Sequence, residues 1–203
     1  MEIDLANSSP RQLYDLLISA VVPRPIAWVS TRSKSGVDNL APFSFFNLFS
    51  ANPPILGFAP GLKRQPGSTE AVMKDTLRNV LETEEFVVNI VSAELAEKMV
   101  QSSANYSAEQ SEFVEAGLTP LASSMIAPPR VAESQVSMEC KLFQVVDLGS
   151  NKLVLGRIIC MHVDDAILRD GMVDIEKLKP VARLGGELYS VVENPFAIKR
   201  PLP

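Results

Sequence analysis

The residues that could do chemistry lie in a few short segments, and these segments carry no familiar hydrolase or kinase motif. The sequence lacks a nucleophile elbow, a P-loop, a Rossmann glycine fingerprint, Cys-x-x-Cys and His-Glu-x-x-His. Two runs stand out instead: Pro23-Arg-Pro-Ile-Ala-Trp-Val-Ser-Thr31 and Asn39-Leu-Ala-Pro-Phe-Ser-Phe-Phe-Asn47. Pro42 cannot donate to a strand ladder, so an edge or bulge exposes backbone groups there. Free amides and carbonyls of this kind suit an amide-rich ring.

These two runs are predicted to form a β-hairpin. Residues 26–31 are rich in β-forming side chains and end at the turn Ser33-Lys-Ser-Gly36, after which 40–46 resume the strand pattern. A helix opens at Ser8 or Ser9 with Pro10 and ends before Pro23, and 55–58 form a third strand. From Thr69 the apolar residues follow helical spacing, which predicts an amphipathic helix.

The second half of the chain continues with strands and short helices. Strands are predicted over 86–91, 136–142 and 153–163, a helix over 93–102, and a helical turn over 111–116 that Gly117 closes. The regular alternation of strands and helices that parallel crossovers need is missing. The fold class expected is therefore mainly β with rim helices (α+β), a small closed or partly closed barrel formed by 1–203 as one domain.

Composition narrows the function classes further. The 203 residues carry a net charge of −5, so no net basic field would hold nucleic acid or an anionic membrane. Two cysteines and one histidine are too few for a zinc cluster, and no metal centre is expected. Residues 39–62 lack charge, but their asparagines and four prolines favour buried strands over a membrane span. The start of the chain shows no secretory signal, and a cytoplasmic location is expected.

The sequence resembles the flavin reductase-like proteins, which have an FMN-binding split β-barrel. The resemblance is carried by the Pro23–Thr31 and Asn39–Asn47 runs, by Ser50-Ala-Asn-Pro-Pro54, and by Lys74-Asp-Thr76 with Asn79. Two later stretches also match: Glu112 to Pro120, which ends in Ala116-Gly-Leu-Thr-Pro120, and Pro180-Val-Ala-Arg-Leu-Gly-Gly186 with Tyr189. Because the blocks occur in the family's order over most of the chain, the resemblance is specific. It implies a homodimer that holds FMN between its subunits.

The resemblance also implies site residues. Those expected to contact the flavin ring and its ribityl chain, or to lie nearby, are Trp28, Ser30, Thr31, Asn39, Ala41, Pro42, Phe43, Ser44 and Asn47. Ser50, Lys74 and Thr76 are expected toward the phosphate, which hydroxyl groups and an ammonium at a helix start can hold. His162 and Arg183 are the candidates for tuning the ring, since positive charge stabilises reduced flavin.

Each of these residues also has a plainer interpretation. Trp28 could be a core aromatic, Lys74 and Thr76 the solvated face of a helix, and His162 a hydrogen-bonded strand residue. Arg183 and the neighbouring Gly185-Gly186 could form an ordinary turn, and the two cysteines small buried residues.

The function expected is that of an FMN-binding oxidoreductase that takes hydride from NADH or NADPH and passes electrons to free flavin or another acceptor. No nicotinamide fingerprint distinguishes NADH from NADPH. One alternative is a flavoredoxin-like electron carrier that exchanges electrons with a protein partner. Another is an oxidase similar to the pyridoxamine-phosphate oxidases, which the lack of a second basic phosphate clamp disfavours.

Overall fold

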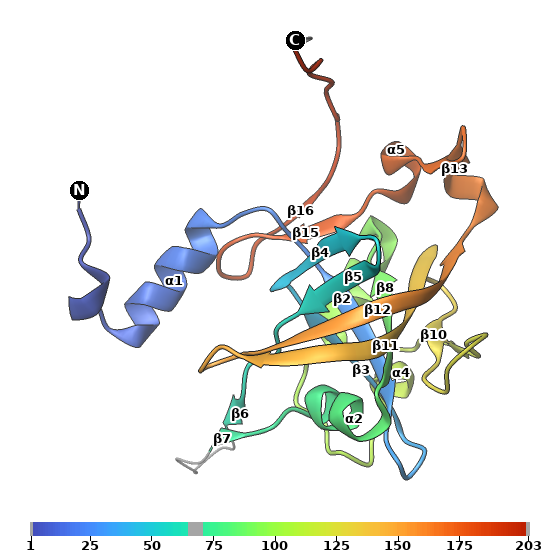
Figure 1. The fold of residues 1–203 in the computed structure, drawn as a ribbon, viewed down its shortest axis with the longest axis horizontal. Coiled ribbons are helices and arrows are strands. Elements are labelled where there is room, and N and C mark those ends of the chain that lie inside the picture. The colour runs from blue at the N-terminus through green and yellow to red at the C-terminus, as the bar shows by residue number, and fades with distance from the viewer. Residues whose placement is uncertain (1, 65–70, 202–203) are drawn as a thin grey trace.

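The seven longest strands of the described chain belong to one antiparallel sheet that curls around a core. The computed structural model describes residues 2–64 and 71–201. The sheet has seven strands in the order β3-β2-β8-β11-β12-β5-β4 (Figure 1). Their bounds are β2 Ala27–Arg32, β3 Asp38–Phe43, β4 Phe46–Ala51, β5 Pro54–Phe58, β8 Glu85–Ile90, β11 Val136–Asp147 and β12 Lys152–Val163. The predicted fold class, mainly β with rim helices, is confirmed.

The predicted first hairpin is present as β2 and β3, with Trp28 opposite Pro42. The strand expected over 40–46 ends earlier, at Phe43, and a new strand, β4, begins at Phe46. The ladder passes Pro42 and ends with Phe43 opposite Ala27, because the chain bends at Ser44 and Phe45. The chain therefore leaves one edge of the sheet at β3 and enters the opposite edge at β4.

Two apolar clusters fill the structure. Inside the curled sheet, the Phe58 ring contacts the Phe43 ring in a tilted arrangement and the Phe86 ring edge-to-face, beside Leu77 of the helix α2 (Asp75–Thr83). A second cluster surrounds Trp28 and lies under α3 (Ala96–Gln101) and α4 (Glu112–Glu115). The two clusters occupy the two faces of β2, which is why five consecutive residues of that strand are buried.

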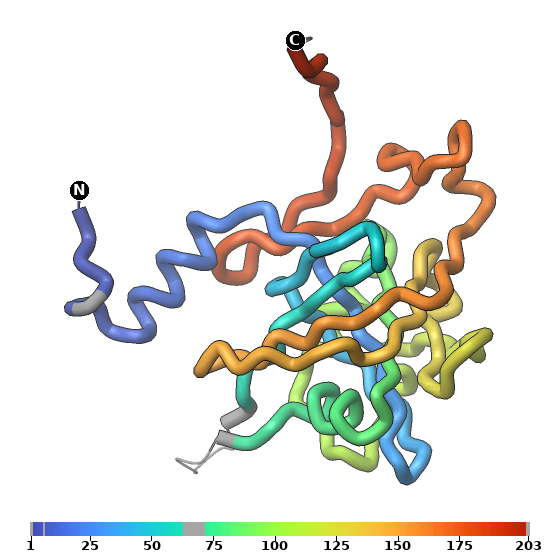
Figure 2. The backbone as a smooth tube through the Cα atoms, viewed as in Figure 1, coloured from blue at the N-terminus to red at the C-terminus, as the bar shows by residue number. Residues whose placement is uncertain are grey.

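The predicted opening helix is present as α1 (Pro10–Ala20), and Ser9 and Gln12 form its capping box. It stands away from the barrel, as Figure 2 shows, and none of its residues is buried. The amphipathic helix expected from Thr69 begins only at Asp75; Ala71–Val72 form the short strand β7, and Thr69 lies outside the described residues. Within the described chain, no helix has both the length and the apolar character needed to cross a bilayer.

The remaining elements are short and decorate the sheet. A second sheet joins β1, β15 and β16, and the predicted helix over 93–102 is divided into η2 and α3. The bounds are β1 Arg24–Pro25, β6 Lys63–Arg64, β9 Pro120–Leu121, β10 Arg130–Val131, β13 Leu168–Arg169, β14 Met172–Val173, β15 Val181–Arg183, β16 Tyr189–Val191, α5 Ile175–Leu178, η1 Leu5–Asn7, η2 Ala93–Leu95 and η3 Asp165–Ile167.

A buried polar network ties α4 to the outer side of β3. The Glu112 carboxylate accepts hydrogen bonds from Asn39 Nδ2 at 2.7 Å and from the Leu40 N–H at 2.9 Å. Asn39 Oδ1 in turn accepts a bond from the Thr76 hydroxyl at 2.8 Å. Burial raises the pKa of Glu112, and the charge of Asp75 adds to this, while the hydrogen bonds to the carboxylate lower it; the net direction is upward.

This raised pKa predicts a pH dependence of stability. Folded Glu112 holds its proton more tightly than the unfolded chain does, so its contribution is complete below the ordinary pKa of 4.5. The contribution decreases as pH rises through the higher pKa of the folded state. We expect the unfolding free energy of the native protein, minus that of Glu112→Gln, to decrease from pH 4 toward neutrality. Urea titrations of both proteins at several pH values measure this difference in unfolding free energy. A difference that increases with pH would contradict the raised pKa of Glu112.

Candidate functional site

Three cavities meet at Pro42 on β3. We name each cavity after one residue that lines it. The Tyr14 cavity has a volume of about 580 Å³, the Thr76 cavity about 80 Å³ and the Arg183 cavity about 250 Å³. Pro42 lines all three, Lys74 lines the first two, and Ser44 lines the first and third. The outer side of β3 therefore forms the floor of one extended depression, whose largest part has the size of an ordinary ligand pocket.

The backbone of β3 presents acceptors to this depression. The N–H and C=O of one residue in an antiparallel strand point to the same side. The Leu40 N–H turns away from β2 to reach Glu112, so the carbonyls of Leu40 and Pro42 face outward as well. Pro42 has no N–H, so at its position the strand offers only an acceptor. The sequence-based expectation of exposed backbone groups here agrees with this geometry.

The start of α2 closes one end of the depression. Lys74 is the N-cap residue and makes no side-chain capping bond, so the first N–H groups of this nine-residue helix lack the usual capping partner. The Lys74 ammonium lies 5.3 Å from the centre of the Phe43 ring. A helix start with an adjacent ammonium is suited to an anion.

Two acidic residues share the Thr76 cavity with Lys74, but both have other partners. Asp75 forms an ion pair with Arg78 at 2.5 Å, and Glu112 accepts bonds from Asn39 and Leu40. The Thr76 hydroxyl donates a hydrogen bond to Asn39 Oδ1. Thr76 thus lines the cavity as predicted, but its hydroxyl holds Asn39 in place.

Arg183 lines the other end of the depression, and Arg24 lies beside it, with its Nε 3.5 Å from Ser44 Oγ. They are opposite each other on β15 and β1, and among the described residues neither pairs with a carboxylate within 4 Å. Burial lowers the pKa of Arg24, the nearby Tyr14 raises it, and the charge of Arg183 lowers it further. The Arg24 guanidinium donates to the carbonyls of Ile18, Val21 and Leu184.

Arg183 stacks on the Tyr189 ring, with its guanidinium carbon 4.4 Å from the ring centre. It also donates to the Tyr189 hydroxyl and to the Gly186 carbonyl. These partners are neutral, and none of the described residues that line the Arg183 cavity is acidic.

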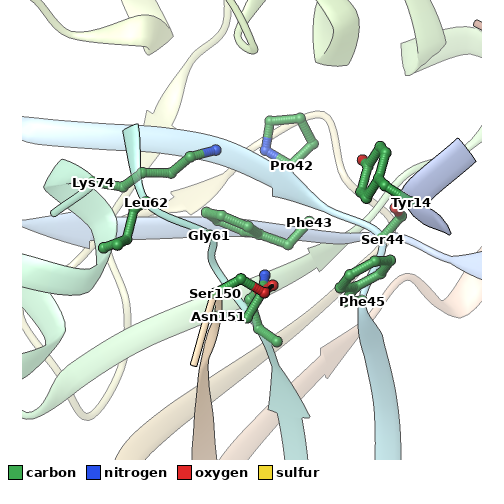
Figure 3. Close-up of a pocket in the computed structure, with 11 residues that line it drawn as sticks. Tyr14, Pro42, Phe43, Ser44, Phe45, Gly61, Leu62, Lys74, Ser150 and Asn151 are labelled. Atoms are coloured by element: carbon green, nitrogen blue, oxygen red, sulfur yellow. Dashed lines mark hydrogen bonds between the residues drawn. The ribbon is translucent and has the colours of Figure 1, made fainter. Parts of the chain in front are cut away.

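The Tyr14 cavity lies between Lys74 and Tyr14, which Figure 3 shows on opposite sides of Pro42. Phe43 and Phe45 add aromatic walls, and Ser150 and Asn151 reach it from the turn between β11 and β12. Tyr14 belongs to α1. Although no residue of this helix is buried, the helix therefore contributes one side chain to the cavity.

Several predicted residues line these cavities. Asn39 and Ala41 line the Thr76 cavity, and Phe43 lines the Tyr14 cavity. Asn47 instead lines a separate, mostly apolar cavity of about 420 Å³ between α1 and β4. Ser50 lies near the far end of β4, which Figure 1 shows well separated from α2, and it lines none of the cavities described here. The structure therefore does not bring Ser50 to Lys74 and Thr76.

Trp28, Ser30 and Thr31 are completely buried and have partners in the protein. The Trp28 indole donates to Ser102 Oγ at 2.9 Å, and the Ser30 hydroxyl donates to the Pro129 carbonyl. Thr31 contacts Asn39 and Asn79. For Trp28 the structure favours the interpretation as a core aromatic. The side chains of all three residues are hydrogen-bonded inside the protein and hold β2 to the elements around it.

His162 lies apart from the depression. Its Nε2 is 2.6 Å from Glu139 Oε1 and 3.5 Å from Cys160 Sγ, and none of the residues lining its cavity lines the three that meet at Pro42. Burial raises the pKa of Glu139, but hydrogen bonds from the Ser124 N–H, His162 and the Met125 N–H outweigh this and lower it. Of the two candidates for tuning a ring, the structure brings only Arg183 to β3.

Sequence reasoning missed several residues of the depression. Tyr14 and Ser103 reach it from α1 and from just past the end of α3, and only their packing in three dimensions reveals this. Arg24 lies beside the depression, with its Nε 3.5 Å from Ser44 Oγ, and it did carry a signal, since it lies within the Pro23–Thr31 run.

Comparisons with known proteins agree with this architecture. Residues 19–178 match the family model of the flavin reductase like domain. A protein of Aquifex aeolicus is 42% identical over 190 residues, which cover 93% of this chain and 94% of that protein. A protein of Halalkalibacterium halodurans is 40% identical over 207 residues, covering 99% and 97%.

Solved structures show the same similarity. Nitrilotriacetate monooxygenase component B from Bacillus cereus is 34% identical, with a TM-score of 0.90 and 98% of each chain covered. The 2-nitrobenzoate 2-nitroreductase of Pseudomonas fluorescens is 30% identical, with a TM-score of 0.89, covering 100% of this chain and 98% of that one. Flavoredoxin of Desulfovibrio vulgaris, at 22% identity and a TM-score of 0.78, shows the common fold. The protein is a split barrel and belongs to the flavin reductase-like family.

Proposed function

We propose that the protein is an FMN-binding oxidoreductase that accepts hydride from NADH or NADPH and passes electrons to free flavin or another acceptor. The observation that carries the proposal is the depression over Pro42, with open carbonyls along its floor and positive charge at both ends. The residues present fit the chemistry of FMN, which combines a phosphate, a polyol chain and an amide-rich ring.

In this proposal, Lys74 and the first turn of α2 hold the phosphate, since an ammonium and helix N–H groups supply charge-assisted bonds to a dianion. One of the two outward carbonyls, of Leu40 or Pro42, would accept a hydrogen bond from the single N–H of the oxidised ring, and Glu112 fixes this part of the strand through its bonds with Asn39 and Leu40.

When bound, FMN supplies the two-electron chemistry, so the protein needs no nucleophile or acid–base pair. Arg183 contributes positive charge that favours the reduced state of the ring, and Tyr189 fixes the guanidinium. The open Tyr14 cavity leaves room for a second molecule beside the ring. Two neighbours at 30% identity or more, a monooxygenase component and a nitroreductase, support a redox role.

Rapid mixing of the FMN-loaded protein with NADH or NADPH under anaerobic conditions tests this function. Bleaching of the flavin absorbance at a rate that saturates with nicotinamide concentration is the expected result. FMN that stays bound but is reduced only by a protein donor would instead identify an electron carrier, and the hydride-accepting function would be wrong.

We predict that Lys74→Ala weakens FMN binding about ten- to a hundredfold, since one charge-assisted bond is worth about 1.5–3 kcal/mol. Fluorescence titration of apo-protein measures the affinity. Lys34→Ala is the matched control, because Lys34 lies in the exposed turn between β2 and β3. Equal affinity in both variants would place the phosphate elsewhere.

Arg183→Gln is expected to lower the potential of bound FMN at every pH, because arginine keeps its charge throughout the accessible range. Arg183→Lys keeps the charge and should restore most of the potential. Spectroelectrochemical titration at pH 6, 7 and 8 distinguishes the variants. If the Arg183→Gln and Arg183→Lys variants both show the native potential, Arg183 does not influence the potential of bound FMN.

We also propose a homodimer. Leu48 and Phe49 on β4 are 59% and 57% exposed, and β4 is an edge strand within the otherwise charge-free stretch 39–62. Sedimentation should show a dimer that Phe49→Asp converts to monomer, while Met172→Asp, in the exposed β13–β14 hairpin, leaves it intact. A native monomer at micromolar concentration would rule the dimer out.

A further inference from the structure

A second cluster of chemically active side chains lies on β11 and β12, away from the depression over Pro42. Cys160 and His162 are two residues apart on β12 and so project from the same face of that strand. Glu139 on β11 is directly opposite Cys160 in the register. One ligand atom from each residue lies within 4.8 Å of the other two.

The arrangement is not a proton relay of the Cys–His–acid kind. Such a relay uses both ring nitrogens, one toward the thiol and the other toward the carboxylate. Here Glu139 Oε1 and Cys160 Sγ both approach the same nitrogen, His162 Nε2, at 2.6 and 3.5 Å. The carboxylate, the thiol and the imidazole therefore converge on one point.

We propose that this point is a binding site for a divalent transition-metal cation, with Zn²⁺ the best match to the ligands. Imidazole, thiolate and carboxylate are the protein ligands of zinc, and three of them with one open position form a typical tetrahedral site. Thiolate and carboxylate together neutralise the cation, and the Cys160 thiol would release its proton to solvent on binding.

The distances allow this with a small adjustment. In a tetrahedral zinc site, nitrogen and sulfur ligands lie about 3.5 Å apart and nitrogen and oxygen about 3.4 Å. Cys160 and His162 already have this spacing, whereas the gap between His162 and Glu139 must widen by about 0.8 Å. The His162 side chain is 24% exposed and has room to move.

The surroundings supply a fixed ligand and an entry path. Glu139 is completely buried, and its two oxygens accept the N–H groups of Ser124 at 2.7 Å and Met125 at 2.8 Å. These bonds orient the carboxylate in the way that outer-sphere partners orient metal ligands. Of the three ligands, His162 lines a cavity of about 460 Å³ and Cys160 is partly exposed, so we expect a cation and a water ligand to approach from this side.

Cobalt substitution tests the site in the full-length protein, freed of metal with a chelator and kept reduced with a phosphine. We expect one Co²⁺ per chain, with visible bands of a tetrahedral ion and a near-ultraviolet thiolate-to-cobalt band. Cys160→Ser should abolish the thiolate band, and His162→Gln should weaken binding by at least about 10- to 100-fold. Cys140→Ala is the matched control, since Cys140 Sγ lies outside the cluster, and it should keep both signals.

A measurement on the native protein does not depend on variants that fail to fold. Cys140 is completely buried, so Cys160 is the thiol that a disulfide reagent reaches. Zn²⁺ should slow this reaction as the site fills, whereas Mg²⁺, which prefers oxygen ligands, should not. Unaltered thiol reactivity with Zn²⁺, or a Co²⁺ complex without a thiolate band, would overturn the proposal and leave Glu139 and His162 as a structural pair.

Discussion

The hydrogen bonds from Asn39 and Leu40 to Glu112 are the constraint on which the proposed flavin site depends. β3 is an edge strand, and an unprotected edge offers its backbone to any other strand. Glu112 uses one N–H of this edge, and Pro42 removes another. What remains is a short row of carbonyls that a further strand cannot pair with regularly but that a small polar ring can reach.

This constraint also organises the charges. The same network connects Glu112 through Asn39 to Thr76, one residue past the start of α2, and so positions the helix start and Lys74 against β3. Near the opposite end, the Arg24 guanidinium donates hydrogen bonds to the Ile18 carbonyl of α1 and to the Leu184 carbonyl. Arg183 has no carboxylate partner within 4 Å in the described chain. A ligand with an anionic tail and a ring that gains negative charge on reduction matches two separated positive groups.

Much of this could be predicted from the sequence, because the main signals are local. Runs of β-forming or apolar residues identified β2, β8 and β12, alternating polarity identified β11, and the Ser9-Pro10 cap identified α1. The break between β3 and β4 was missed, because the switch from one sheet edge to the other depends on the long-range pairing of β5, the hairpin partner of β4, with β12. The sequence predicted that the amphipathic helix starts at Thr69, whereas α2 starts at Asp75. The prediction was too early because Val72 fits helical spacing as well as it fits a strand.

The site residues divide along the same line. Pro42, Lys74 and Arg183 carry signals of their own, namely a proline in a strand, a cation at a helix start and a basic residue before a glycine turn. Ser50, His162 and Trp28 do not line the depression. Their absence from it could not be predicted, because the register and curl of the sheet decide which side chains share a face. The Cys160-Met-His162 spacing on a strand was a usable signal, but its third member, Glu139, comes from the neighbouring strand.

A comparison of FMN with riboflavin tests the central claim most directly, because the two differ only in the phosphate. Fluorescence titration of metal-free apo-protein should show that FMN binds at least about tenfold more tightly than riboflavin, since the charge-assisted bonds at Lys74 and α2 act only on FMN. Equal affinities would contradict the placement of the phosphate at α2, and no binding of either molecule would contradict the flavin site as a whole.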